Sequence, residues 1–183
     1  HLINPEKLWT QTKQTLQEIA ELYQEIKPVP KEKIIIATEG MRINLGQNVE
    51  LRVLETLGHA SHHLSFYQSD AIFVGDAAGM YLNKFDVIVP TTPAPFNLEM
   101  TLASISRLAE MNPKDLYYTH FGKVGDAVRR LKTYKNRLKL WAEVVVEEMK
   151  TRDDPNEIYQ KILMRDLEIN AVSDFLQNHM IFR

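Results

Sequence analysis

The sequence predicts a mixed α/β layer architecture that ends in a helical tail. The elements run helix, strands, helix, strand, helices, which is typical of layered α/β domains. The apolar spacing also changes, from a period of about two to about 3.6 residues, after the segment PTTPAPF. Of the 183 residues, 44% are hydrophobic and 25% charged, which is enough to build a packed core.

The first predicted element is an amphipathic helix followed by a short strand. Asn4-Pro5-Glu6 supplies a cap, a proline and an early acid, the usual start of a helix. One helical face is then lined by Trp9, Thr12, Leu16, Ile19, Tyr23 and Ile26. The segment KPVP ends this helix, and the apolar residues 34–37 predict a short buried strand.

The middle of the chain predicts a series of strands. NLGQN at residues 44–48 indicates a turn, and residues 49–53 alternate apolar and charged side chains as a half-exposed strand does. HLSFY and AIFV, at residues 63–67 and 71–74, predict two more strands with a turn at 68–70. DVIVP at residues 86–90 predicts another strand.

The rest of the chain predicts mainly helices. Asn97 can cap a helix that ends at Asn112-Pro113, and DLYYTH at residues 115–120 predicts a strand. A long amphipathic helix is expected from Val128, a second helix opens at Asp154-Pro155, and a third covers residues 167–176. A soft boundary at residues 122–125 divides the chain into residues 1–122 and a helical extension, 123–183.

Composition excludes several classes of function. The net charge of −2, from 22 basic and 24 acidic residues, leads us to expect neither a nucleic-acid partner nor an anionic membrane surface. The chain has no cysteine, so any transition metal must bind imidazole and carboxylate groups. No apolar run reaches the roughly 20 residues of a membrane span. No signal peptide is visible either, and we expect a cytoplasmic protein. The chain starts at His1 without an initiator Met, and we expect the natural protein to begin upstream.

Three ligand-type residues follow predicted strand ends. His59 follows Gly58 in TLGHASHH, Asp76 follows Gly75 in FVGDAAG, and His120 follows the strand in YYTHFG. Loops at strand ends are where a rigid scaffold presents reactive groups. Two imidazoles and one carboxylate are suitable ligands for zinc, iron or manganese. Taken singly, each residue has a plainer interpretation: a histidine bonded to a loop carbonyl, an aspartate that forms a turn, or a histidine at a strand edge.

Taken together and in this order, the three motifs resemble the later metal-binding motifs of the metallo-β-lactamase superfamily. The family's frequent second histidine, four residues after the first, falls on His63. The resemblance covers the chain to about residue 122, and the later helices more loosely. It implies the C-terminal part of an αββα sandwich with a helical extension. A half sandwich should expose apolar strand residues, for which we expect Leu51, Val53, Leu64 and Phe66.

The resemblance also implies a role for each residue. His59 would bind one metal, His120 a second, and Asp76 would bridge the two, with His63 and Tyr118 as outer supports. The implied cofactors are two divalent cations, with zinc expected ahead of iron or manganese. The implied activity is a hydrolase in which a metal-bound hydroxide attacks an ester, thioester, lactone or phosphodiester bond of a small molecule.

The superfamily's most diagnostic motif, His-x-His-x-Asp-His, is absent from this chain. We therefore expect an N-terminal segment of the same protein to complete the site. The alternative is a non-catalytic interaction module that retains half of the fold, and a weaker one is redox chemistry at iron. The C-terminal helices could also pair two subunits as a homodimer.

Overall fold

The computed structural model describes residues 1–120, 122–151 and 154–178, and it divides into two units, residues 1–37 and 38–183. The first unit contains helix α1 (Glu6–Leu16) and two 3-10 helices, η1 (Gln17–Tyr23) and η2 (Lys31–Lys33). The Asn4 side chain accepts a hydrogen bond from the Glu6 amide at 3.2 Å, which supports the predicted helix start. The regular α-helix is shorter than predicted, because its second half winds as a 3-10 helix.

The predicted strand at residues 34–37 is wrong. The structure assigns no strand there, and the side chains of Ile35 and Ile36 are 78% and 83% exposed. A strand is stable only when a neighbouring strand satisfies its backbone groups, and the sheets of the described residues include no pairing for residues 34–37. The apolar pattern therefore indicated a segment that could be buried, without indicating what would bury it.

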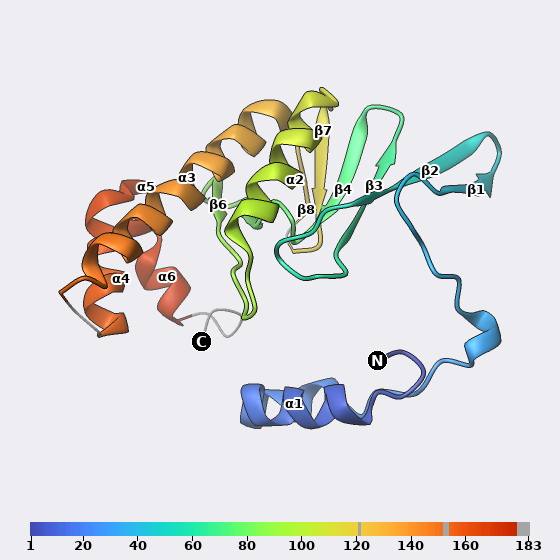
Figure 1. The fold of residues 1–183 in the computed structure, drawn as a ribbon, viewed down its shortest axis with the longest axis horizontal. Helices are drawn as coiled ribbons and strands as arrows, with labels where there is room; N and C mark the ends of the chain where they lie inside the picture. The colour runs from blue at the N-terminus through green and yellow to red at the C-terminus, as the bar shows by residue number, and fades with distance from the viewer. Residues whose placement is uncertain (121, 152–153, 179–183) are drawn as a thin grey trace. The chain divides into compact units, whose positions relative to one another are not determined.

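The second unit is built on a six-stranded sheet in the order β1-β2-β3-β4-β7-β8 (Figure 1). Its strands are β1 (Arg42–Gly46), β2 (Val49–Glu55), β3 (Leu64–Gln68), β4 (Ala71–Gly75), β7 (Asp115–Tyr118) and β8 (Gly122–Val124). The four predicted strands at β2, β3, β4 and β7 are confirmed. β1 and β8 were not predicted. The expected turn at residues 44–48 is confined to Gln47 and Asn48, both with positive φ.

Three strands of this sheet end at the same edge. β4 and β7 are parallel neighbours, whereas β2 and β4 are each antiparallel to β3, so β2, β4 and β7 all run in one direction. Their carboxyl ends therefore lie together, and the loops that follow them meet at that edge. His59, Asp76 and His120 belong to these three loops.

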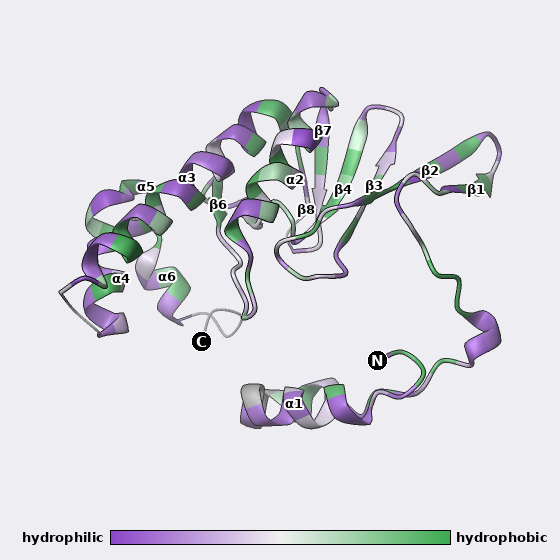
Figure 2. Cartoon of the chain, viewed as in Figure 1, coloured by the Kyte–Doolittle hydropathy of each residue, from purple (hydrophilic) through white to green (hydrophobic). Residues whose placement is uncertain are grey.

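The main core lies between one face of the sheet and two helices. Helices α2 (Leu98–Glu110) and α3 (Ala127–Glu148) cover that face, as Figure 1 shows. Asn97 caps α2 as predicted, because its side chain accepts a hydrogen bond from the Met100 amide at 3.0 Å. Strand β4 is hydrophobic along much of its length (Figure 2). Its inward residues Ile72 and Val74 are fully buried with Ile105, Leu108, Leu131 and Tyr134 of the helices.

A smaller core joins a two-stranded hairpin to the C-terminal helices. The hairpin consists of β5 (Met80–Leu82), which was not predicted, and β6 (Val87–Val89), which was. It packs with α4 (Pro155–Arg165), α5 (Leu167–Asn170) and α6 (Ser173–Asn178). The single helix predicted for residues 167–176 is thus two short helices, separated at residues 171–172. None of the helices in the described ranges is both long and apolar enough to cross a membrane.

Gly58 allows helix α2 to start directly against the β2–β3 loop. The Gly58 carbonyl accepts a hydrogen bond from the Asn97 amide at 2.9 Å. Gly58 has a φ of +128°, and a Cβ at this position would lie 2.7 Å from the Cα of Thr101. We expect Gly58→Ala to lower the free energy of unfolding by about 2 kcal/mol or more, from backbone strain and overpacking. Gly40→Ala is the control for the effect of φ alone, because Gly40 also has a positive φ but open space around its Cβ position. An equal loss in both variants, measured by denaturant unfolding, would contradict the packing argument.

Candidate metal centre

The three predicted ligands converge at the carboxyl edge of the sheet. The Asp76 Oδ2 atom lies 3.9 Å from His59 Nε2, and the Oδ1 atom lies 3.5 Å from His120 Nε2. Each carboxylate oxygen therefore faces a different histidine. The side chains of His59, Asp76 and His120 are 17%, 26% and 39% exposed, so a small ligand can reach them.

The strand register explains how Asp76 reaches this position. Gly75 pairs with Tyr118 across a register shift in β4, so the strand is locally bulged where it ends. Gly75 has a φ of +57°, which an L-residue adopts only under strain, and a Cβ there would lie 2.6 Å from His63 Nε2. The bulge and the glycine thus turn the chain so that Asp76 points between the two histidine loops.

His59 is oriented through its other ring nitrogen. Its Nδ1 atom lies 3.1 Å from the carbonyl oxygen of Thr91. A carbonyl only accepts hydrogen bonds, so the proton of this bond sits on Nδ1 and the Nε2 lone pair faces Asp76. The plainer interpretation of His59, a bond to a loop carbonyl, therefore also applies, and it is the arrangement that prepares an imidazole to bind a metal.

His63 holds the backbone of Asp76 instead of joining the three ligands. Its Nε2 atom accepts a hydrogen bond from the Asp76 amide at 3.0 Å. On the other side, Nδ1 lies 2.8 Å from Thr56 Oγ1, which lies 2.8 Å from Ser65 Oγ. Ser65 donates its only hydroxyl hydrogen to the Val74 carbonyl at 3.2 Å, so Thr56 must donate to Ser65, and His63 Nδ1 to Thr56. The chain of bonds fixes His63 as the neutral Nδ1–H tautomer.

The electrostatic surroundings favour the same neutral state. Burial is the main cause that lowers the pKa of His63, and the nearby His59 and His62 lower it further, against the opposing charge of Asp76. A His pKa lowered by folding stabilises the protein when the ring is neutral. This stabilisation is present above pH 6.5 and is lost as the pH falls through the lowered value.

We therefore expect the metal-free protein to lose stability on acidification below pH 6.5, partly through His63. His63→Gln should be less stable at neutral pH but lose less on acidification, because the titrating ring is gone. Ser61→Ala, at an exposed position of the same loop, should follow the unmutated protein. Denaturant unfolding across pH 5 to 8 is the measurement, and identical pH profiles for the two variants would contradict the role of His63.

Tyr118 lies in the main core, on the side of β7 that faces the helices. Its ring centroid is 5.8 Å from that of Tyr81, and burial raises the pKa of its phenol. Its hydroxyl has no hydrogen-bond partner among the described residues. Tyr118 therefore supports the chain before His120 by packing, and its expected role as an outer support of the metals stays a prediction.

The donor set fits divalent cations in chemistry and in spacing. With metal–ligand bonds near 2.1 Å, two ligands of a tetrahedral cation lie about 3.4 Å apart. The Asp76–His120 pair matches that spacing, and the Asp76–His59 pair is slightly wider. However, no group of three or more His, Cys, Asp or Glu side chains in the described residues is arranged to hold one metal ion. Each histidine–carboxylate pair offers two ligands, and a cation there needs further ligands from elsewhere.

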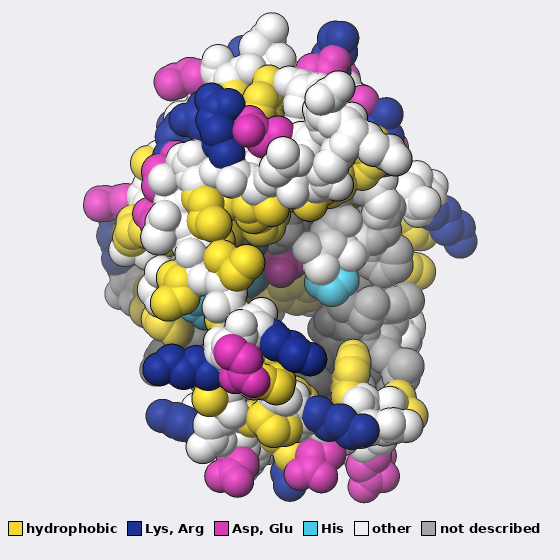
Figure 3. All heavy atoms as spheres, turned by 90° about the vertical axis from the view of Figure 1, so that its right-hand side faces the viewer, with side chains coloured by type: hydrophobic (Ala, Val, Ile, Leu, Met, Phe, Trp, Pro, Cys, Tyr) yellow, Lys and Arg dark blue, Asp and Glu magenta, His cyan; other side chains and the backbone are white. Residues whose placement is uncertain are grey.

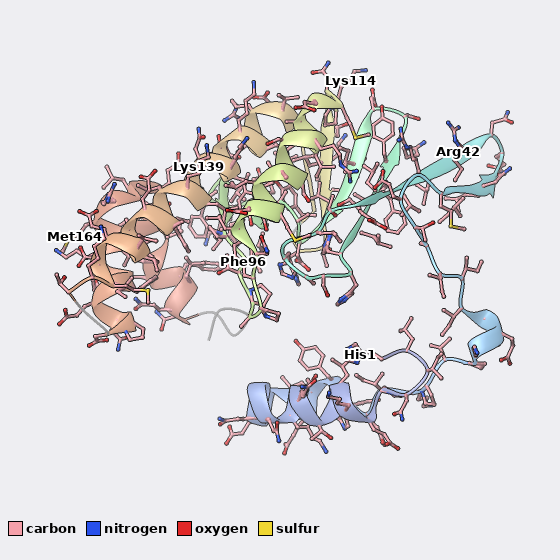
Figure 4. The ribbon with its side chains drawn as sticks, viewed as in Figure 1. His1, Arg42, Phe96, Lys114, Lys139 and Met164 are labelled. Atoms are coloured by element: carbon pink, nitrogen blue, oxygen red, sulfur yellow. The ribbon has the colours of Figure 1, made fainter. Side chains whose placement is uncertain are left out.

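Sequence reasoning missed the residues that orient this site. Thr56, Ser65 and Thr91 are separated from the ligands they support by turns of the chain, and no spacing rule links them. The segment PTTPAPF, which contains Thr91, marks the change of apolar spacing, and no role was expected for Thr91 itself. Phe96, labelled in Figure 4, projects from the same loop between β6 and α2.

Known proteins resemble this chain in sequence and in structure, although no protein-family model matches it. The metallo-β-lactamase fold-containing protein ST1585 of Sulfurisphaera tokodaii is 31% identical over 144 residues, which cover 79% of this chain and 51% of the relative. This chain thus spans about half the length of that relative.

Solved structures show a similarity to the same superfamily. The crystal structure of ST1585, described as an archaeal metallo-β-lactamase superfamily protein, superposes with a TM-score of 0.64 at 26% identity, over 85% of this chain and 59% of that one. The family protein TTHA1429 of Thermus thermophilus has a TM-score of 0.60 at 20% identity, over 86% and 53%, and shows the shared fold. The expected resemblance to the metallo-β-lactamase superfamily is therefore confirmed, in sequence as well as in fold.

Proposed function

We propose that the natural protein is a metal-dependent hydrolase and that this chain supplies His59, Asp76 and His120 to a site for two divalent cations. The observation that carries the proposal is that Asp76 presents one carboxylate oxygen to each of two histidines. A bridging carboxylate requires this arrangement, because its two oxygens must reach two cations. A single ion pair, or an aspartate that only forms a turn, does not require both carboxylate oxygens to face histidines.

The chemistry of the residues suits this role. His59 enters with a fixed tautomer, and the backbone of Asp76 is held by His63, so both start close to the geometry that a cation requires. When bound, divalent cations such as zinc lower the pKa of a coordinated water and polarise the bond that is cleaved. Among structures with the same fold, one is a sec-alkyl sulfatase, PisA1, with a TM-score of 0.53 at 16% identity. We propose an ester, thioester, lactone or phosphodiester of a small molecule as the substrate.

We further propose that an N-terminal segment of the same protein supplies the remaining ligands. Across the sheet, Val53, Phe66, Phe73 and Tyr117 are register partners and share the face opposite α2 and α3. Phe73 is 41% exposed, and its ring stacks on that of Tyr117 at 4.8 Å. Figure 3, viewed from the β1–β2 side, shows hydrophobic side chains gathered near acidic and histidine side chains.

Of the four strand residues expected to be exposed, Val53 is fully buried, whereas Leu51, Leu64 and Phe66 are half-buried. The expectation was thus wrong for Val53. A relative of which the match covers only about half also supports a missing covering segment. A cytoplasmic location and a homodimer formed through the C-terminal helices stay predictions.

A non-catalytic interaction module is the second candidate, and the absence of a three-ligand group among the described side chains favours it. Turnover by the complete natural protein separates the two. The protein is stripped with a chelator, reloaded with zinc, iron or manganese, and assayed with an aryl ester, a thioester, a lactone and a phosphodiester.

We expect turnover of at least one of these compounds, its loss on metal removal and its recovery on reloading. His120→Ala should abolish the recovered activity, whereas His62→Ala, in an exposed neighbour of the site, should keep it. Full activity without metal would contradict the proposal. A loaded protein without turnover on any class of compound would support the interaction module.

A further inference from the structure

Thr91 contacts two of the three proposed ligands from one position. It lies two residues after β6, between Pro90 and Pro93, whose rings restrict the backbone of this loop. Its carbonyl oxygen lies 3.1 Å from His59 Nδ1, and its hydroxyl oxygen lies 3.5 Å from the same atom. The hydroxyl donates a hydrogen bond to the Asp76 carbonyl at 3.3 Å.

These contacts have a consistent arrangement of hydrogens. The Thr91 hydroxyl donates its only hydrogen to the Asp76 carbonyl. Towards His59, the hydroxyl oxygen and the carbonyl oxygen of Thr91 can therefore act only as acceptors. The Nδ1 hydrogen of His59 is therefore held in a fork between the two oxygen atoms of one residue. This fork sets both the tautomer and the plane of the ring, and so the direction of the Nε2 lone pair.

The backbone of Asp76 is held at both ends. Its amide donates to His63 Nε2 at 3.0 Å, and its carbonyl accepts from the Thr91 hydroxyl and from the Gly79 amide at 3.1 Å. The carboxylate extends from this fixed backbone by a short side chain. A small rotation of the backbone would move both oxygens away from the two histidines, because each points to a different one.

We propose that Thr91 is a positioning residue that couples His59 and Asp76, so that the bridging carboxylate and the first imidazole are aligned before any cation binds. The inference rests on the proposed metal function for its consequence, although the alignment itself is a property of the metal-free chain. The hydroxyl is the group that a substitution can test, because the carbonyl is present whatever the side chain.

Thr91→Val removes the hydroxyl but keeps nearly the same side-chain shape, whereas Thr91→Ser keeps a hydroxyl at this position. Thr92→Val is the matched control, because Thr92 is the exposed next residue in the same loop. The complete natural protein is first studied without metal. Hydrogen exchange of the Asp76 amide and the ¹⁵N tautomer signals of His59 are measured, with denaturant unfolding as a check of global stability.

In Thr91→Val we expect faster exchange of the Asp76 amide, beyond any change explained by global stability, while the Thr91 carbonyl keeps His59 as the Nδ1–H tautomer. Zinc affinity, measured by competition with a chromophoric chelator, should fall about 10- to 100-fold, the usual effect of losing an outer-shell partner. Thr91→Ser should return the amide exchange and the zinc affinity close to the unmutated values, and Thr92→Val should not change them.

Unchanged amide exchange and zinc affinity in Thr91→Val would overturn the inference. So would equal losses in Thr91→Val and Thr91→Ser, because the hydroxyl would then not be the group that matters. If the unmutated protein binds no zinc, the proposed function fails. The exchange readout then still decides whether the Thr91 hydroxyl holds the backbone of Asp76.

Discussion

Asp76→Asn is expected to weaken the binding of both cations in the complete natural protein by more than about 100-fold, beyond the effect of an outer-shell change. The substitution keeps the shape of the side chain but removes its negative charge. Two cations a few ångströms apart repel each other, and a carboxylate between them offsets that repulsion. Asp76 is placed for this role because its two oxygens face His59 and His120 separately.

Metal content per chain, by elemental analysis after dialysis, distinguishes Asp76 from the histidines. His59→Ala and His120→Ala should each lose mainly one cation, whereas Asp76→Asn should lose both. Asp70→Asn is the control, because Asp70 precedes the opposite end of β4 and forms an exposed ion pair with Lys114 at 2.6 Å. Full metal content with lost turnover in Asp76→Asn would contradict bridging and indicate a proton-transfer role.

Asp166→Ala should lower the free energy of unfolding by about 3–5 kcal/mol, because it removes the buried carboxylate that pairs with Arg137 and leaves the guanidinium only the exposed Glu168 carboxylate and the Ile88 carbonyl. Arg137 and Asp166 have side chains that are only 6% and 5% exposed, and Arg137 Nε donates to Asp166 Oδ2 at 2.7 Å. The same carboxylate accepts from Trp141 Nε1 at 2.8 Å and from the Ile169 amide at 3.3 Å, and so caps α5. Arg137 also donates to the Ile88 carbonyl at 2.7 Å, which ties α3 to β6.

Thermal unfolding is the measurement, and the loss corresponds to a fall in Tm of roughly 6–20 °C. Glu147→Ala is the control, because Glu147 forms an exposed ion pair with Arg165 at 3.0 Å, and such pairs contribute about 1 kcal/mol or less. The double variant Arg137→Met/Asp166→Leu should recover much of the loss, since no unpaired charge stays buried. A similar small effect for Asp166→Ala and Glu147→Ala would contradict the account of this network.

Much of the sheet and the meeting of the three ligands could be predicted from sequence, for a physical reason. Side chains alternate along β2 and β3 with a period of two, β4 is a short apolar run, and each strand is followed by a glycine or a polar turn. Strands that run in one direction bring their carboxyl ends to one edge. A ligand-type residue after each of three such strands is therefore a signal that local reasoning can detect.

The remaining features depend on contacts distant in sequence. β5 and β8 have three residues each, too few for a period to show, and residues 34–37 have a strand-like pattern without a partner. The tautomer of His63 follows from Thr56, Ser65 and Val74, and the hold on His59 follows from a carbonyl 32 positions away. Such hydrogen bonds leave no periodic pattern in the sequence.

Anomalous diffraction at the zinc edge, from crystals of the complete natural protein loaded with zinc, tests the central claim most directly. The account predicts two peaks, one within bonding distance of His59 Nε2 and Asp76 Oδ2, the other of His120 Nε2 and Asp76 Oδ1. A protein without a peak at Asp76, or with a single peak that only one of these histidines contacts while the other turns away, would contradict it.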